Sequence, residues 1–216
     1  MTVCHVFCTG GNMRDYHFFA TVSRMKYINR WALMRNSRME DLSEHSLEVA
    51  MIAHALCMIG NVRYGKHLNG ERAAVIALYH DASEIITGDL PTPVKYYSDE
   101  IRDAYKNVES LAEDQLLEEL PDDLKEIYRG ILKADTSQED RLLRRYVKAA
   151  DKLSALIKCI EEESAGNTEF KTAKISTEES LKEMIPEIPE INDFITEFLS
   201  SYGSTLDELQ IGRAHV

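Results

Sequence analysis

The spacing of the apolar residues constrains the fold of this chain more than any other feature. From Phe18 onward they recur at helical intervals of three and four, and no alternating run typical of a strand exceeds about four residues. No internal repeat is present. The pattern therefore predicts an all-α fold, a single helical-bundle domain over residues 13–200. The expected helices span residues 16–29, 42–60, 71–86, 98–119, 122–134, 136–166, 174–184 and 189–200.

Two of these helices have recognisable starts. Asp41 can cap the helix over residues 42–60, with Glu44 at its third position. Thr136 with Glu139 forms a capping box for the long helix that begins there. These signals place the helix boundaries more firmly than periodicity does.

Composition excludes several classes of protein. With 216 residues, of which 44% are hydrophobic, the chain can bury a core without disulfides or an obligate metal. Its net charge of −12 disfavours nucleic-acid binding. No segment approaches the ~18 to 20 apolar residues of a membrane span, and no secretory signal is evident. The four cysteines, which form no CxxC pair, are Cys4, Cys8, Cys57 and Cys159. We expect a cytoplasmic protein with no nucleic-acid or membrane partner.

The two ends differ from the rest of the chain. Residues 1–12 carry no charged side chain when His5 is neutral, and they stop at a Gly-Gly pair. Residues 211–216, IGRAHV, match the translation of a common sequencing adapter. We expect both ends to be non-native or disordered and leave them out of the functional argument.

One histidine points into the predicted core. At 100° per residue, His45 shares a stripe with Val49, Ile52, Leu56 and Ile59. A buried imidazole needs a partner. Taken alone, His45 would be satisfied by a backbone carbonyl or an acid.

The helix expected over residues 71–86 makes a purely structural role less plausible. Ala73, Ala77, His80, Asp81 and Glu84 fall on one of its sides, and the remaining positions are mostly apolar. Three ionisable groups inside an apolar helix are costly unless they are paired or bind a cation. Because imidazole and carboxylate together suit a divalent transition metal, the pattern favours a metal site over a structural network.

Several motifs resemble those of a known family. They are SEHS around His45, YHDASE at 79–84, TGDLPTPVKY at 87–96, AADKLSALIKCIEE at 149–162 and INRWALMRN at 28–36. In this order they resemble the HD-domain phosphohydrolases, and more narrowly the bacterial YfbR-like 5′-deoxynucleotidases, over nearly all of residues 13–200. The resemblance implies an HD-domain helical bundle that acts as a homodimer. It also implies a metal-dependent 5′-deoxynucleotidase that hydrolyses deoxyribonucleoside 5′-monophosphates to deoxynucleosides and phosphate.

The resemblance implies one divalent cation, held by His45, His80, Asp81 and Asp151. Periodicity does not show this for Asp151, which lies opposite the apolar stripe of its helix, where a solvated aspartate is the simpler interpretation. No histidine occurs between Asp81 and Asp151, which favours one metal over two and argues against a redox enzyme. The ligand set accepts manganese, cobalt, iron, nickel or zinc.

The resemblance also assigns the reacting groups. Glu84 would be the catalytic acid or base, or alternatively a residue that orients His80. Arg30 would hold and orient the phosphate for catalysis, since a guanidinium matches phosphate geometry. Trp31 would crowd the 2′ position of the sugar, although without the family match an aromatic anchor for the first helix is the simpler interpretation.

A loop between two expected helices would complete the substrate contacts. The full implied set is Arg30, Trp31, Asp81, Asp89, Leu90, Pro91, Thr92 and Asp151. For residues 89–92 the alternative is a plain connecting turn. Lys95, Lys152 and Arg35 could add positive potential, but solvated charge is the simpler interpretation.

Two other functions remain open at this point. One is an HD-domain phosphohydrolase for another nucleotide, a triphosphate or pyrophosphate, and the other is a non-catalytic nucleotide-binding regulator. The presence of Arg30 and Trp31 favours the monophosphate enzyme over the first, and the complete set of polar site residues argues against the second. Base preference and the dimer interface cannot be derived from the sequence.

Overall fold

A computed structural model describes residues 15–95, 97–134 and 137–211. In this part of the chain the regular elements are helices, and the β-type contact is a single bridge between Asn29 and Asp41. The expected all-α fold is therefore confirmed. The expected non-native ends fall outside the described residues, apart from Ile211 at the end of the last helix.

The elements are α1 (Phe18–Val22), η1 (Ser23–Tyr27), α2 (Leu42–Arg63), α3 (Gly70–Tyr79), α4 (Glu84–Thr87), α5 (Thr92–Lys95), α6 (Asp99–Glu118), α7 (Asp122–Leu132), α8 (Gln138–Ser164), α9 (Lys171–Met184), α10 (Glu190–Glu197), η2 (Leu199–Ser201) and α11 (Leu206–Ile211).

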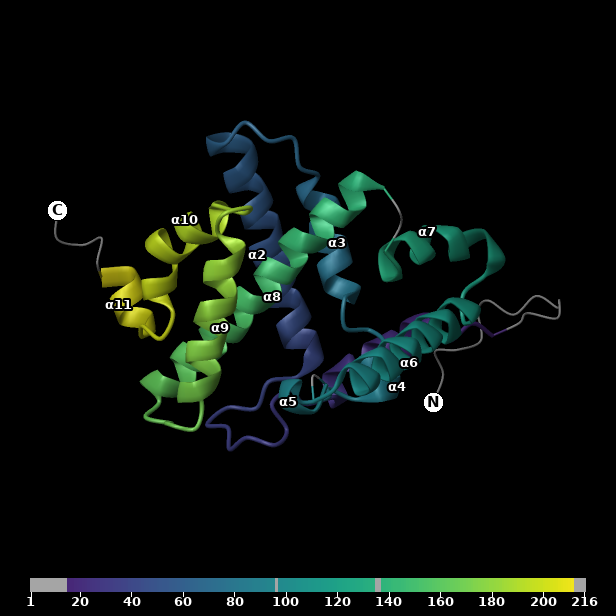
Figure 1. Cartoon of the computed structure of the whole chain (residues 1–216), viewed down its shortest axis with the longest axis horizontal. Coiled ribbons are helices and arrows are strands. Elements are labelled where there is room, and N and C mark those ends of the chain that lie inside the picture. The colour runs from purple at the N-terminus through teal and green to yellow at the C-terminus, as the bar shows by residue number, and fades with distance from the viewer. Residues whose placement is uncertain (1–14, 96, 135–136, 212–216) are drawn as a thin grey trace, which may run out of the picture.

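The fold is organised around α2. This helix packs against α3 and α8, α9 covers α8, and α10 returns to α2 (Figure 1). The interior is filled from these helices by residues such as Leu56, Ile76 and Leu153, each at most 1% exposed. A second, smaller core joins α1 and α6 to the start of α2 through Phe18 and Leu116. The bundle thus holds the first turns of α2 between two cores.

Helix α2 begins where its capping signal predicts. The Asp41 carboxylate accepts hydrogen bonds from the backbone N–H groups of Ser43 (2.8 Å) and Glu44 (3.0 Å). Contrary to the expectation from the sequence, α2 is long and apolar enough to cross a membrane, with 22 residues and a mean hydropathy of 1.2. However, 56% of its most apolar window is buried inside the fold, as in the core helix of a globular protein. The stripe predicted from periodicity is confirmed, since Val49, Ile52, Leu56 and Ile59 are all buried.

The expected continuous helix over residues 71–86 is wrong beyond Tyr79. Helix α3 ends there, and tighter turns follow, with Ala82 N bonded to Tyr79 O (3.0 Å) and Glu84 N to Asp81 O (3.0 Å). The His80 side chain also bonds to the Ala77 carbonyl, at 2.7 Å, and so competes with the helical ladder. Consequently His80 and Asp81 do not lie on a regular helix face.

Other boundaries shift for similar local reasons. The first helix is short and turns into η1, where Ser23 Oγ donates to Ala20 O at 2.8 Å. The long helix α8 is capped by Ser137, whose hydroxyl accepts from Asp140 N (3.0 Å), one residue later than predicted; Thr136 lies outside the described residues. The expected helix over residues 189–200 is divided into α10 and η2.

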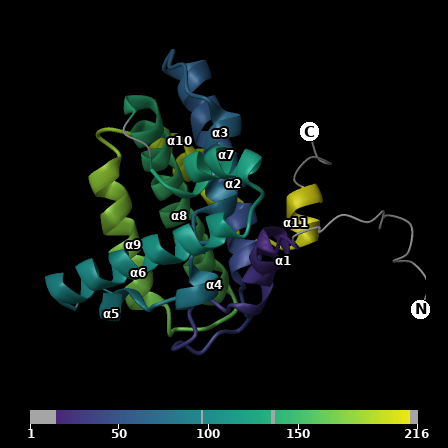
Figure 2. The same cartoon turned by 90° about the vertical axis from the view of Figure 1, so that its right-hand side faces the viewer.

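The loop between η1 and α2, residues 28–41, reaches the turn between α8 and α9. In both views it lies at the same end of the molecule as that turn and α5 (Figures 1 and 2). Asn167 Nδ2 in the turn donates to Arg35 O in the loop at 2.7 Å. Segments more than a hundred residues apart in the sequence therefore meet at this end of α2.

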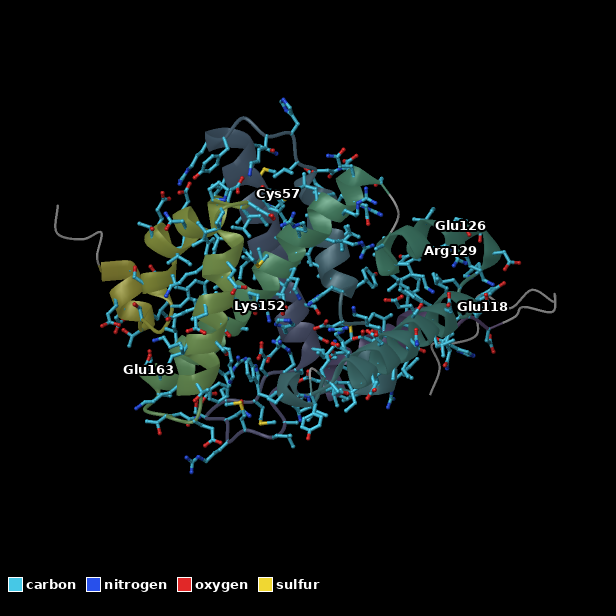
Figure 3. The ribbon with its side chains drawn as sticks, viewed as in Figure 1. Cys57, Glu118, Glu126, Arg129, Lys152 and Glu163 are labelled. Atoms are coloured by element: carbon cyan, nitrogen blue, oxygen red, sulfur yellow. The ribbon has the colours of Figure 1, made fainter. Side chains whose placement is uncertain are left out.

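Ion pairs near the surface lie along α7 and between α7 and the end of α6, on the right of the view in Figure 3. Lys125 pairs with Glu118 at 2.8 Å and Arg129 with Glu126 at 3.2 Å (Figure 3). Pairs of this kind each contribute at most about 1 kcal/mol to stability because water screens them. The charges relevant to function are the buried ones near the start of α2.

Candidate metal centre and its surroundings

Three of the predicted ligands converge at the start of α2. His45 on α2 and His80 and Asp81 in the turn after α3 each offer one ligand atom, and these atoms all lie within 4.8 Å of one another. An Asp81 oxygen, Oδ2, lies 3.2 Å from His80 Nε2 and 3.6 Å from His45 Nε2. The His45 side chain is fully buried. The two imidazoles are thus fixed around one carboxylate.

The fourth predicted ligand comes from α8. Asp151 Oδ1 lies 3.3 Å from His45 Nε2, and its side chain is 25% exposed. The solvated position that periodicity suggested for Asp151 is therefore wrong. Its partial burial raises its pKa, but the nearby His45, His80 and Arg30 outweigh this and hold the pKa below its ordinary range.

The hydrogen bonds of His80 suit it to bind a cation. Its Nδ1 lies 2.7 Å from Ala77 O, and because a carbonyl only accepts, Nδ1 carries the proton and Nε2 carries the lone pair. That Nε2 is buried, has no hydrogen bond to any described residue, and faces an Asp81 oxygen. In a neutral imidazole with the proton on Nδ1, Nε2 and the Asp81 oxygen are both ligand atoms for a cation, so this donor set fits a divalent transition metal.

His45 is supported from its other nitrogen. Nδ1 lies 3.1 Å from Ser154 Oγ, and the Ser154 hydroxyl donates to Glu48 Oε2 at 2.6 Å. Arg30 Nη1 lies 2.5 Å from the same Nδ1. Ser154 Oγ can accept from Nδ1 and so orient a ligating imidazole, whereas the Arg30 guanidinium, which only donates, cannot. Sequence reasoning missed Ser154 and Glu48, although each stands one helical turn from a predicted ligand.

Glu84 is a buried acid at the start of α4. Its side chain is 8% exposed, and its Oε2 has no hydrogen bond within the described residues. Burial, reinforced by the negative charges of Asp81 and Asp89, raises the pKa of Glu84 to about 9. Such a group holds a proton at neutral pH, a property common among catalytic acids.

Arg30 and Trp31 lie beside the cluster in the loop before α2. Arg30 Nη1 is 3.2 Å from Glu40 Oε1, and its Nη2 is 3.9 Å from Asp151 Oδ1. The Trp31 ring packs edge-on against Phe170 at 5.3 Å between centroids, so it does not serve as the anchor of the first helix. The structure therefore brings both predicted substrate residues to the metal-ligand cluster.

The expected nucleotide loop also reaches this place. Asp89 Oδ2 accepts a hydrogen bond from Trp31 N at 3.2 Å, after a turn in which Gly88 has φ +73°. Burial raises the pKa of Asp89, although Arg30 opposes this. Leu90 and Pro91 are half-buried beside Asp89, and the side chain of Thr92 lies outside the described part of the chain.

The three basic side chains that could add positive potential near the site are Lys95, Arg35 and Lys152. Lys95 is bound to Glu109 at 2.8 Å, and the Arg35 side chain is 79% exposed, 3.6 Å from Glu169. Lys152 lies on α8 (Figure 3), next to Asp151 in the sequence. The simpler interpretation, charge directed to solvent or to an acidic neighbour, fits Lys95 and Arg35.

A buried ion pair fastens the loop to α8. Lys158 Nζ lies 2.5 Å from Glu162 Oε1, and the two side chains are only 6% and 1% exposed. Glu162 also accepts from Ser37 N (2.8 Å) and Asn167 Nδ2 (2.7 Å), while Lys158 donates to Arg38 O (2.5 Å). These bonds hold the loop that carries Arg30 and Trp31 at a fixed distance from α8.

Comparisons with known proteins identify the family of the chain. A sequence profile described as "5′-deoxynucleotidase YfbR-like" matches residues 17–202. A 5′-deoxynucleotidase from Erwinia tasmaniensis is 50% identical over 193 residues, which cover 89% of this chain and 96% of the relative. The 5′-deoxynucleotidase YfbR from Salmonella paratyphi B is 48% identical over 197 residues, or 91% of this chain and 97% of the relative.

Solved structures show the same fold. An HD-domain phosphohydrolase from Listeria innocua superposes with a TM-score of 0.73 and 27% identity, covering 86% of this chain and 88% of its own. The cyanophage S-2L HD phosphohydrolase DatZ, bound to dA and one catalytic Zn²⁺ ion, has a TM-score of 0.58 and 17% identity over 84% of this chain and 93% of its own. At that identity the second likeness concerns the fold alone.

Proposed function

The chain belongs to the YfbR-like family of 5′-deoxynucleotidases, and we propose that the cluster around His45 is its catalytic centre. The protein is a phosphoric monoester hydrolase that cleaves deoxyribonucleoside 5′-monophosphates to deoxynucleosides and phosphate. In the reaction the oxygen of water bonds to phosphorus, the bond from phosphorus to the 5′-oxygen breaks, and that oxygen takes up a proton.

We propose that one divalent transition-metal cation is held by His45, His80, Asp81 and Asp151. The observation that carries this is the convergence of three ligand atoms, with His80 Nε2 and Asp81 Oδ2 3.2 Å apart and both within 4.8 Å of a His45 nitrogen. When bound, such a cation supplies Lewis acidity, which makes water a stronger acid and offsets phosphate charge. Manganese, cobalt and zinc all suit two imidazoles and two carboxylates.

Arg30 and Glu84 are proposed to act on the phosphate ester. Arg30 lies beside Asp151, where its guanidinium can hold phosphate oxygens in a two-pronged contact. Burial raises the pKa of Glu84, so its protonated form can donate a proton to the 5′-oxygen of the leaving deoxynucleoside, and the carboxylate that results can take up the proton that the attacking water gives up.

Trp31 and residues 89–92 are proposed to hold the sugar and base. The indole is fixed against Phe170 and can exclude a 2′-hydroxyl by its volume. The hydrogen bond from Trp31 N to Asp89 ties the two segments together, so that both can contact one bound nucleotide. Asp81 and Asp151 complete the substrate contacts from the side of the cation.

We also propose that the protein is a cytoplasmic homodimer that does not bind nucleic acid. The net charge of −12 opposes contact with a phosphate backbone, and Cys57 and Cys159 are buried free thiols, as a reducing compartment allows. Leu47 and Met51 on α2 are more than half exposed and available for a subunit contact. Light scattering after size exclusion would give a mass of two chains if this is right and of one chain if it is wrong.

The function is tested by phosphate release from dAMP and AMP in parallel. The protein is first stripped with a chelator and then reloaded with manganese or cobalt. We expect hydrolysis only after reloading, with dAMP strongly preferred. Equal rates with both substrates would contradict the proposal that Trp31 excludes the 2′-hydroxyl. Hydrolysis without metal would contradict the proposal that the cluster is a catalytic metal centre.

A further inference from the structure

Glu40 is a buried carboxylate that touches both proposed substrate residues. It is 6% exposed and precedes the Asp41 cap of α2. Its Oε1 lies 3.2 Å from Arg30 Nη1 and 3.6 Å from His45 Nδ1, and its Oε2 accepts a hydrogen bond from Trp31 Nε1 at 3.0 Å. One side chain thus connects the guanidinium, the indole and a metal-ligand imidazole.

The backbone fixes where this carboxylate lies. Arg30 N donates to Glu40 O at 2.9 Å, Leu42 N donates to Ile28 O at 3.0 Å, and an antiparallel bridge pairs Asn29 with Asp41. The two ends of the loop are therefore paired next to the first turn of α2. Glu40 is consequently a preorganised group, so little of its position is left to side-chain freedom.

Trp31 needs such support because its own backbone does not favour its conformation. Its φ of +58° lies in the left-handed region, which is unfavourable for a bulky residue. Contacts to its backbone and its ring oppose this strain: Asp89 accepts from its N–H, Met34 N and Asn36 Nδ2 donate to its carbonyl oxygen, Phe170 packs on its ring, and Glu40 accepts from its Nε1. The indole has one N–H donor, so Glu40 alone determines how its polar edge is directed.

We propose that Glu40 is a positioning residue that sets the selectivity for deoxyribose over ribose and, through Arg30, the orientation of the phosphate. This inference rests on the proposed function, in which Trp31 excludes the 2′-hydroxyl and Arg30 holds the phosphate. Steric exclusion requires a wall that does not yield, and the hydrogen bond from the indole to a buried carboxylate supplies that rigidity. Because the Glu40 carboxylate binds both the Arg30 guanidinium and the Trp31 indole, it keeps the phosphate-binding group and the sugar-excluding ring at a fixed separation.

The first test is fluorescence of the cation-free protein, since Trp31 is the only tryptophan in the chain. Emission and acrylamide quenching are compared for the parent chain, Glu40→Gln and Glu40→Ala. Gln keeps the volume but has one acceptor oxygen for two donors, and Ala has none. We expect both variants to shift the emission to the red and to raise the quenching constant, with the larger change in Glu40→Ala. This readout needs neither substrate nor metal.

The matched control is Glu44→Gln. Glu44 carries the same charge four residues further on, is exposed, and binds Arg38 rather than the site residues, with a distance of 2.7 Å. We expect its fluorescence and its substrate preference to equal those of the parent chain. A change in Glu44→Gln as large as that in Glu40→Gln would mean that general loss of negative charge causes the effect, and would overturn the proposal.

The second test is the ratio of kcat/KM for dAMP to that for AMP. Both substrates are measured on one preparation, so the fraction of folded or metal-loaded enzyme cancels from the ratio. Loss of a hydrogen bond to a charged group predicts a fall of about tenfold in Glu40→Ala, with a smaller fall in Glu40→Gln. The kcat/KM for dAMP itself should also fall, because Arg30 loses its partner.

Trp31→Ala separates this inference from the function on which it rests. If Trp31→Ala lowers the ratio and the Glu40 variants fold but do not, Glu40 does not position the indole and the inference is wrong. If Trp31→Ala also leaves the ratio unchanged, the proposed role of Trp31 fails as well. A fall in the ratio for Trp31→Ala and both Glu40 variants, with altered fluorescence in the latter, supports the inference.

Discussion

Glu162→Gln tests whether α8 holds the substrate loop through a buried charge. Lys158 keeps its position 2.5 Å from residue 162 but loses its counter-ion, in a place where both side chains are almost fully buried. Removing one member of a buried ion pair costs about 3 to 5 kcal/mol, because it leaves an uncompensated charge. We therefore expect the free energy of unfolding at pH 7 to fall by about 3 kcal/mol.

The pH dependence gives an independent value for the same interaction. Burial by itself raises the pKa of Glu162, but hydrogen bonds from Lys158, Ser37 and Asn167 outweigh it and lower the pKa from 4.5 to about 2. A depressed pKa stabilises the fold above the unfolded value of 4.5, and that stability is lost as the pH falls toward 2. At 1.36 kcal/mol per unit the contribution is about 3 kcal/mol, which agrees with the first figure.

Urea unfolding of the parent chain and of Glu162→Gln at a series of pH values measures how much the buried ion pair contributes to stability. The stability difference between the parent chain and Glu162→Gln should be about 3 kcal/mol at pH 6 and should shrink as the pH falls below 4.5. The control is Glu163→Gln, because Glu163 is the exposed neighbour bound to Lys174 (Figure 3), and its loss should cost less than about 1 kcal/mol. A constant difference across pH, or equal costs for the two variants, would refute the reasoning.

Three further predictions concern the cluster. Asp151→Asn should weaken binding of cobalt, measured by calorimetry, because it replaces a charged ligand by a neutral amide; unchanged affinity would place Asp151 outside the metal site. Glu84→Gln should lower kcat for dAMP by about 10² to 10⁴-fold while leaving cobalt affinity nearly the same, as expected for a proton donor. Ser154→Ala should lower cobalt affinity by about 10 to 100-fold, since the imidazole of His45 loses its support, and an intact affinity would show that the contact is incidental.

Helix periodicity and helix-capping residues could be predicted from the sequence, because both depend on residues close together in the chain. The stripe that contains His45 follows from helical periodicity, and the Asp41 cap follows from residue type; both are confirmed. The break after Tyr79 could not be derived in this way, because it depends on a side-chain bond from His80 to the Ala77 carbonyl. The same bond fixes which nitrogen of His80 is free for a metal.

The remaining features of the site depend on contacts between distant segments. Periodicity assigned Asp151 to solvent because it detects only the main apolar stripe of α8. Asp151 lies outside that stripe but faces His45 near the start of α2. Glu40 lies outside the motifs, and Glu162 ends the motif at 149–162 but receives no role from it. Glu40 acquires its role only when the loop folds back on Arg30, and Glu162 only when α8 passes the loop. Without the tertiary structure, both would be taken for ordinary surface acids.

A cobalt titration that records bound metal and phosphate release from dAMP in the same samples tests the central claim most directly. The stripped protein should be inactive, activity should rise in proportion to bound cobalt, and both should reach a plateau at one cation per chain. In His80→Ala both signals should be lost together. Activity in the stripped protein, or a plateau of activity at two cations per chain, would contradict a single metal centre formed by His45, His80, Asp81 and Asp151.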